Sequence, residues 1–197
     1  MTGQAQADRR RGPRERLLDT AYELFSRRGI RGVGVEEVIE RAGVAKATLY
    51  RHFPSKDALV LAFLERREQH WTRDLLEVQT GRPHASPRER LLGIFDVLDE
   101  RIHGEDFDAY LFFNALLEMG AEHPAGRASV RHLEHIRSIV RQLADEAGLR
   151  DTDDFARSWQ ILMKGSIIAA AEGDPDAAEH AKAMARSLIE RHRAPGS

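Results

Sequence analysis

Two short helical segments joined by a glycine turn constrain this chain more than any other feature. Residues 35–57 read VEEVIERAGVAKATLYRHFPSKD. The first segment has one apolar face, made by Val35, Val38, Ile39 and Ala42. Gly43 tolerates the positive φ that a sharp turn demands, and Leu49 and Phe53, four residues apart, give the second segment a core-facing side. This arrangement predicts a helix-turn-helix, whose second helix suits the major groove of DNA.

The rest of the chain also reads as helix, so we expect an all-α fold of about nine helices. No segment alternates apolar and polar residues in the way of a half-buried strand. Glycine, proline and capping residues place the helix ends, for example Ser86 with Glu89 and Ser55 before Lys56. The expected helices cover residues 13–28, 35–42, 46–53, 56–79, 86–103, 108–119, 126–147, about 154–172 and from 174 onward.

The charges are unevenly distributed along the chain. Residues 1–57 hold twelve Lys and Arg against eight Asp and Glu, a net charge of +4, whereas the remainder carries −6. A basic segment ahead of an acidic body suggests DNA at that end. Arg9, Arg10 and Arg11 form a short basic arm, or alternatively a solvated tail.

Composition excludes several other classes of protein. The chain has no cysteine, which excludes disulfides and thiol chemistry. Its apolar runs are too short to span a membrane, and residues 1–11 lack the apolar stretch of a signal peptide. We therefore expect a soluble, cytoplasmic protein.

The segment RAGVAKATLYRHFPSKDAL resembles the signature of the TetR family of transcriptional regulators. The preceding RLLDTAYELFSRRGIRGVGVEEVIE resembles the first two helices of that family, so the close resemblance covers about Arg14 to Leu64. It implies a three-helix DNA-binding domain at residues 1–54 and a larger helical domain at 55–197 that binds a ligand and forms a dimer. Two positions depart from the family: Gly34 replaces the usual Ser or Thr, and Ala47 stands where Gly is frequent.

The resemblance assigns DNA contacts to seven residues. Lys46 and Ala47 occupy positions that approach bases or phosphates, and Arg51 occupies one that can reach a base edge. The phosphate-contacting positions of the family are occupied by Thr48, Tyr50, His52 and Lys56. Such a division fits the general rule that phosphate contacts position a protein while base edges specify the sequence. From spacing alone, a packed helical corner with basic residues is the alternative.

The segment at 108–119 is apolar almost all round, which predicts a central, buried helix. In the TetR family this region encloses a ligand cavity, so the resemblance implies a mainly apolar pocket with a few polar groups. The expected pocket residues are Phe63, Trp71, Ile102, Tyr110, Asn114, Glu118 and Trp159. The alternative is an ordinary core in which Asn114 bonds to the backbone.

Small residues are frequent in the last two helices, and small residues let helices approach closely. The resemblance implies that these helices pair with their copies in a homodimer. The expected interface residues are Ile161, Gly165, Ile168, Ala177, Ala181, Met184, Ala185 and Leu188. The alternative is that this face packs within one chain.

No metal or cofactor site is expected. His132 and His135 are three residues apart, whereas the zinc-binding HExxH motif needs four, so we expect solvated histidines. An all-helical enzyme is the rival class, but it would leave the basic helix-turn-helix unexplained, and no catalytic motif is present. The sequence predicts a dimeric repressor that a small, mainly apolar ligand releases from a palindromic DNA operator. A ligand-independent regulator or an activator of the same fold is the alternative.

Overall fold

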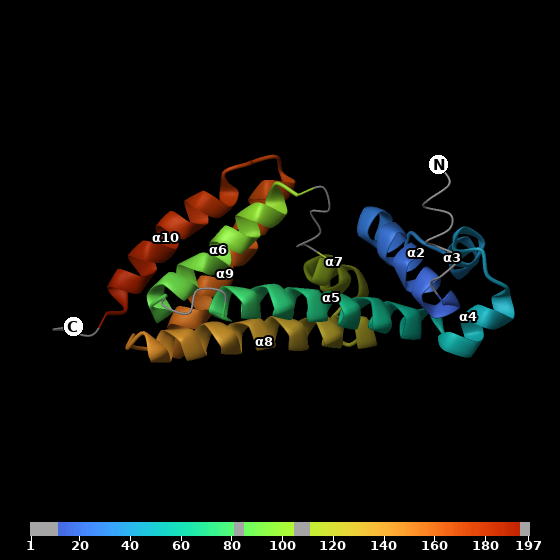
Figure 1. Ribbon diagram of the computed structural model, residues 1–197, viewed down its shortest axis with the longest axis horizontal. Coiled ribbons are helices and arrows are strands. Elements are labelled where there is room, and N and C mark those ends of the chain that lie inside the picture. The colour runs from blue at the N-terminus through green and yellow to red at the C-terminus, as the bar shows by residue number, and fades with distance from the viewer. Residues whose placement is uncertain (1–11, 81–84, 105–110, 194–197) are drawn as a thin grey trace. The chain divides into compact units, whose positions relative to one another are not determined.

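A computed structural model describes residues 12–80, 85–104 and 111–193, with only the backbone described for 71–80. These residues form nine α-helices and no strand, which confirms the all-α prediction (Figure 1). The helices are α2 (Pro13–Arg28), α3 (Val35–Ala42), α4 (Lys46–His52), α5 (Lys56–Thr80), α6 (Pro87–Ile102), α7 (Leu111–Met119), α8 (Pro124–Glu146), α9 (Thr152–Ala171) and α10 (Ala177–Arg191). In the described part of the chain, no helix has the length and apolar character needed to cross a membrane.

The chain divides into two compact units. Unit 1 takes its described residues from Met1–Glu68 and Leu111–Val130, and unit 2 from Gln69–Tyr110 and Arg131–Ser197. The expected functional boundary after residue 54 stays a prediction. By packing, unit 1 also includes the start of α5, all of α7 and the start of α8.

Helix α2 supplies much of the core of unit 1 because one side of it is entirely apolar. Its buried residues are Leu17, Leu18, Ala21, Leu24 and Phe25. The ring of Phe63, from α5, meets the ring of Phe25 edge-on at 5.5 Å and that of Tyr22 at 5.7 Å. Edge-to-face aromatic pairs of this kind add to the stabilisation from burial, so α5 is held firmly against α2.

Two helix starts are capped as the sequence predicts. Ser86 Oγ accepts the Glu89 N–H at 3.3 Å, while Glu89 Oε2 accepts the Ser86 N–H at 2.6 Å, which completes a capping box at α6. Ser55 Oγ accepts the Ala58 N–H at 3.1 Å at the start of α5. These bonds satisfy N–H groups that a helix leaves without an internal partner.

Three other helix starts differ from the expected positions, and α9 is one of them, since it begins at Thr152 and not at about 154. Helix α8 begins at Pro124, two residues early, because the His123 ring accepts the Ala125 N–H at 3.2 Å and proline suits the first turn. Helix α10 begins later than 174, because Asp174 accepts the N–H of Asp176 at 3.0 Å in a turn ahead of the helix. The expected start of α7 at residue 108 lies outside the described residues.

Helix α10 packs along both α6 and α9 in unit 2. Its buried face consists of Ala177, Ala178, Ala181, Ala185 and Ile189. The prediction that Ala177, Ala181 and Ala185 contact a second chain is therefore wrong, because each is at most 5% exposed within its own chain. The small residues bring α10 close to its own neighbours instead.

Trp159 is the largest fully buried side chain among the described residues of unit 2. Its ring lies 5.0 Å from that of Phe95 on α6 and 5.4 Å from that of Phe155 on its own helix. The next residue, Gln160, donates from Nε2 to the Leu133 carbonyl of α8 at 2.6 Å. Aromatic packing and this buried hydrogen bond together fix the rotation of α9.

Candidate nucleic-acid interface

The turn between α3 and α4 has the geometry that the sequence predicts. Gly43 adopts the left-handed conformation, with φ 60° and ψ 42°, and the Val44 N–H bonds to the Ile39 carbonyl at 3.3 Å. This pattern closes the end of α3 and sends the chain directly into α4. Of the expected inward residues of α3, Val38 and Ala42 are buried, while Val35 and Ile39 are half-buried.

Two buried residues set the rotation of α4. Leu49 is fully buried and Phe53 is 3% exposed, so the opposite side of this one helix faces solvent. The exposed residues of that side are Lys46, Ala47, Tyr50, Arg51 and His52. The two remaining predicted contacts, Thr48 and Lys56, are half-buried. All seven residues thus lie on α4 or at the first position of α5, and none of them is buried.

Ion pairs connect α2 to α3, the helix that precedes α4. Arg28 Nη1 of α2 lies 2.6 Å from Glu37 Oε1 of α3, and Arg41 of α3 lies 3.6 Å from Glu23 of α2. Exposed pairs of this kind contribute little stability one by one. Sequence spacing did not reveal them, since the partners belong to different helices.

A further ion pair connects α3 to α4. Lys46 Nζ donates to Glu36 Oε1 at 2.7 Å, from the first residue of α4 to the first turn of α3. This hydrogen bond is the main cause that lowers the pKa of Glu36 and raises the pKa of Lys46. Both groups therefore stay ionised throughout the neutral range.

Gly34, the N-cap of α3, makes no side-chain cap, in agreement with its departure from the family pattern. Its φ is −82°, which any residue adopts, and a Cβ at this position would meet no atom within 4 Å. The departure therefore removes a hydroxyl group but does not reflect a lack of space.

Glu118 has a role that the sequence did not indicate. Its carboxylate, on α7, accepts the N–H of Ile30 at 2.9 Å and the N–H of Arg31, both in the loop between α2 and α3. Gly29 begins this loop at φ 74°, and a Cβ there would lie 3.1 Å from Glu118 Oε2. The prediction that Glu118 lines a ligand pocket is corrected by these contacts, because both carboxylate oxygens are bound to the loop.

The other expected pocket residues are distributed over the two units. Phe63 is buried in unit 1, and Asn114 is exposed there on α7, so the alternative of a buried Asn114 is also wrong. Ile102 is half-buried and Trp159 fully buried in unit 2. The side chain of Trp71 and all of Tyr110 lie outside the described residues.

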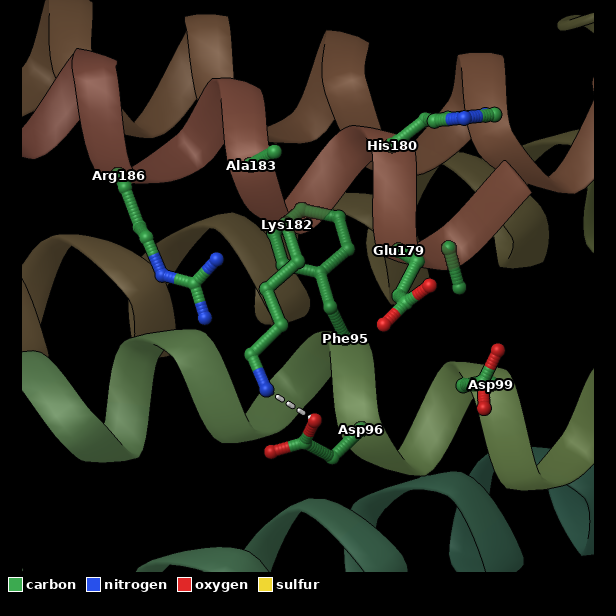
Figure 2. A pocket seen from close by; sticks show the side chains of 9 residues that line it. Phe95, Asp96, Asp99, Glu179, His180, Lys182, Ala183 and Arg186 are labelled. Carbon is green, nitrogen blue, oxygen red and sulfur yellow. Dashed lines mark hydrogen bonds and ion pairs between the residues drawn. The ribbon is translucent and has the colours of Figure 1, made fainter. Parts of the chain in front are cut away.

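Two hollows on unit 2 are lined by other residues. One, of about 330 Å³, lies between α6 and α10, where Lys182 forms an ion pair with Asp96 across the gap (Figure 2). Figure 2 places Asp99 and Glu179 to one side of this pair and Arg186 to the other. Because its charges are mixed, this hollow differs from the mainly apolar pocket that the sequence predicts.

The second hollow, of about 360 Å³, lies on the faces of α9 and α10 that carry exposed apolar residues. It is lined by Ser158, Ile161, Leu162, Met184, Ser187, Leu188 and Arg191. Ile161 is 69% exposed and Met184 60%. Ile168, about two helical turns beyond Ile161 on α9, is 45% exposed. Of the remaining interface residues that the sequence predicts, Gly165 is exposed and Leu188 half-buried.

The described residues contain no group of three or more His, Asp or Glu that could hold a metal ion. His135 is exposed on α8, but His132 is only 2% exposed, so the prediction of a solvated histidine is wrong for His132.

Comparison with known proteins links this geometry to transcriptional regulators. Residues 17–63 match the family described as "Bacterial regulatory proteins, tetR family". The chain is 35% identical over 156 residues to an uncharacterized HTH-type transcriptional regulator of Mycobacterium tuberculosis, which covers 78% of this chain and 73% of that protein. It is 36% identical over 83 residues to the HTH-type transcriptional repressor NemR of Escherichia coli, 42% of this chain and 41% of NemR. The crystal structure of a TetR-family transcriptional regulator from Streptomyces coelicolor, 26% identical, matches 92% of this chain and 96% of its own with a TM-score of 0.85.

Proposed function

This chain belongs to the TetR family of bacterial regulatory proteins, and from this premise we propose that it is a dimeric repressor released from a palindromic DNA operator by a small, mainly apolar ligand. Its relatives are transcriptional regulators and not enzymes, so the rival class of an all-helical enzyme is discarded. Repression is the proposed direction because NemR, which resembles 42% of this chain, is a named repressor.

The exposed side of α4 carries the proposal of operator recognition. Lys46 and Arg51 supply positive charge there, while Tyr50 and His52 add groups that can bond to phosphate oxygens. Leu49 and Phe53 hold the helix by its other side, so these groups are presented together to a major groove.

The outer faces of α9 and α10 support the proposal of a homodimer. Ile161, Ile168 and Met184 leave apolar surface exposed on a single chain, and burying such surface favours association. TetR-family regulators typically form dimers. A two-fold dimer places two recognition helices on one DNA face, which is the reason to expect a palindromic operator.

Release by a ligand is proposed because TetR-family regulators typically respond to small-molecule effectors. We place the ligand in the C-terminal helical region near Trp159, whose aromatic neighbours Phe95 and Phe155 offer a mainly apolar setting. Helix α5 begins at Lys56 beside α4 and continues beyond Trp71, so a tilt of α5 would change the separation of the two recognition helices in a dimer. The ligand must bind the DNA-incompetent state more tightly, since equal affinity for both states shifts nothing.

DNA binding is tested by measuring the affinity of the full chain for a random duplex and for fragments of the genome that encodes it. We expect binding that falls steeply as salt rises, with a slope set by the number of phosphate contacts. Selected fragments should contain an inverted repeat. Binding that is absent at low salt would refute the proposed function.

Ligand release is tested by screening apolar metabolites for a change in tryptophan fluorescence and for loss of operator binding. Trp71 and Trp159 are the only tryptophans of the chain, so a ligand near Trp159 should alter the emission. By reciprocity, operator DNA should weaken ligand binding by the same factor. A compound that alters fluorescence and leaves the operator bound would favour a ligand-independent regulator, and stimulated transcription in a reporter assay would favour an activator.

A further inference from the structure

Glu36 places a carboxylate beside the proposed DNA-binding side of α4. It lies on α3 and accepts a hydrogen bond from Lys46, the first residue of α4, at 2.7 Å. Both side chains are mostly exposed, at 70% for Glu36 and 64% for Lys46. Because exposed pairs add little to stability, the pair has its main effect on the charge and direction of the Lys46 ammonium.

The pair changes what Lys46 can offer to DNA. An ammonium group has three N–H donors, and one of them is used by Glu36, so two remain for a base edge. The negative charge of Glu36 also cancels the charge that would attract a phosphate, and it repels any phosphate that approaches Lys46 from the side of α3. Neutral acceptors such as the O6 and N7 atoms of guanine meet a smaller repulsion.

We propose that Glu36 is a specificity-determining residue, which directs Lys46 toward base edges and disfavours binding through the phosphate backbone alone. The inference rests on the proposed function, since it concerns the same recognition helix. Glu36 lowers the affinity for every DNA sequence, but it lowers the affinity for non-operator DNA most. It thereby increases the ratio between operator and non-operator binding.

The test compares Glu36→Gln with the wild-type chain on two duplexes, one selected by the wild type from a randomised pool and one of the same composition in scrambled order. Affinity is measured by fluorescence anisotropy over a series of salt concentrations. We expect Glu36→Gln to bind the scrambled duplex more tightly, with a salt slope steeper by about 0.9, the value for one additional phosphate contact. The operator-to-scrambled ratio should fall by about fivefold, the lower end of what one good base contact contributes.

Two further variants separate this role from a general effect of charge. Glu40→Gln removes an exposed carboxylate one helical turn further along α3 and should leave the ratio nearly unchanged. In a Lys46→Ala background, Glu36→Gln should lose its effect on the ratio, since Glu36 acts through Lys46. Circular dichroism and thermal melting should show that all of these exposed substitutions leave the fold intact.

The outcomes distinguish this inference from the proposed function. A wild-type chain that discriminates between the duplexes, with Glu36→Gln matching Glu40→Gln, would refute the role of Glu36 and leave the repressor proposal standing. An undiminished Glu36→Gln effect in the Lys46→Ala background would also refute it. A wild-type chain that selects no duplex from the pool and does not bind the scrambled one would refute both.

Discussion

Arg51 and Lys56 differ in how freely their side chains can move. Arg51 is exposed on the outward side of α4, where its planar guanidinium can reach the floor of a groove. Lys56 is half-buried at the first position of α5, and the contact proposed for it is with the phosphate backbone. The two residues should therefore contribute to different quantities, base preference for Arg51 and general affinity for Lys56.

Lys56→Ala should weaken binding to every sequence and reduce the salt slope by about 0.9, because it removes the phosphate contact that we propose for this residue. Arg51→Ala should alter the preference at one operator position by about 1–3 kcal/mol, the range for a good bidentate base contact. Anisotropy titrations with a set of singly changed operators measure both effects. Arg27→Ala, which removes an exposed arginine of α2, serves as the control. The opposite assignment would follow if Lys56→Ala changed base preference and Arg51→Ala weakened all sequences equally.

What could be predicted for single residues depended on how local their interactions are. The burial of Leu49 and Phe53 follows from their spacing on one helix, and the conformation of Gly43 follows from the turn. Glu118 is different, because its partners are backbone N–H groups 87 and 88 residues earlier in the chain. In the sequence, Glu118 is a polar residue in an apolar helix, which favours a pocket. Its actual partner, the loop between α2 and α3, is brought next to it only by folding.

At the scale of elements, α7 stabilises the loop between α2 and α3 through one carboxylate. Glu118→Ala would leave the N–H groups of Ile30 and Arg31 without this acceptor. The Arg31 bond is exposed, so water can replace it, whereas the Ile30 bond is part-buried and water can replace it only in part. We expect a loss of about 1–3 kcal/mol in the free energy of unfolding, the usual cost of depriving such groups of a partner. Urea denaturation followed by circular dichroism measures it.

Two variants complete this test. Glu118→Gln keeps one carbonyl acceptor and should lose less stability than Glu118→Ala. Glu122→Ala changes an exposed glutamate in the turn after α7 and should have an effect below about 0.5 kcal/mol. Equal stability of Glu118→Ala and Glu122→Ala would show that the contact contributes nothing to the folded state.

The helix boundaries could be predicted well because their signals are local. Ser86 with Glu89 and Ser55 act as caps where the sequence places them. The partner of a helix face could not be predicted in the same way. Ala181 and Ala185 indicate close packing, but small residues do not say whether the neighbouring helix belongs to the same chain.

At the scale of the whole molecule, we expect light scattering to give about twice the chain mass of 22.3 kDa. The double variant Ile161→Glu with Met184→Glu should be monomeric, because association would bury two added carboxylates from each chain. Its circular dichroism should match that of the wild type, since both positions are exposed in the single chain. Ala183→Glu, an exposed position on the side of α10 that faces α6, should remain dimeric. A wild-type monomer at micromolar concentration would refute the dimer.

Unit 1 is built from two stretches of chain, since the chain leaves it after Glu68 and returns at Leu111. This interruption has a consequence for biosynthesis. At about 5–20 residues per second, several seconds pass on the ribosome between the synthesis of α4 and that of Glu118. During that interval α4 exists without the Glu118 carboxylate that binds the loop between α2 and α3. This contact joins residues that are separated by almost half of the finished chain. A product released early would therefore carry α4 in an incompletely assembled unit, so translation itself delays the completion of the DNA-binding end until much of the following region has been made.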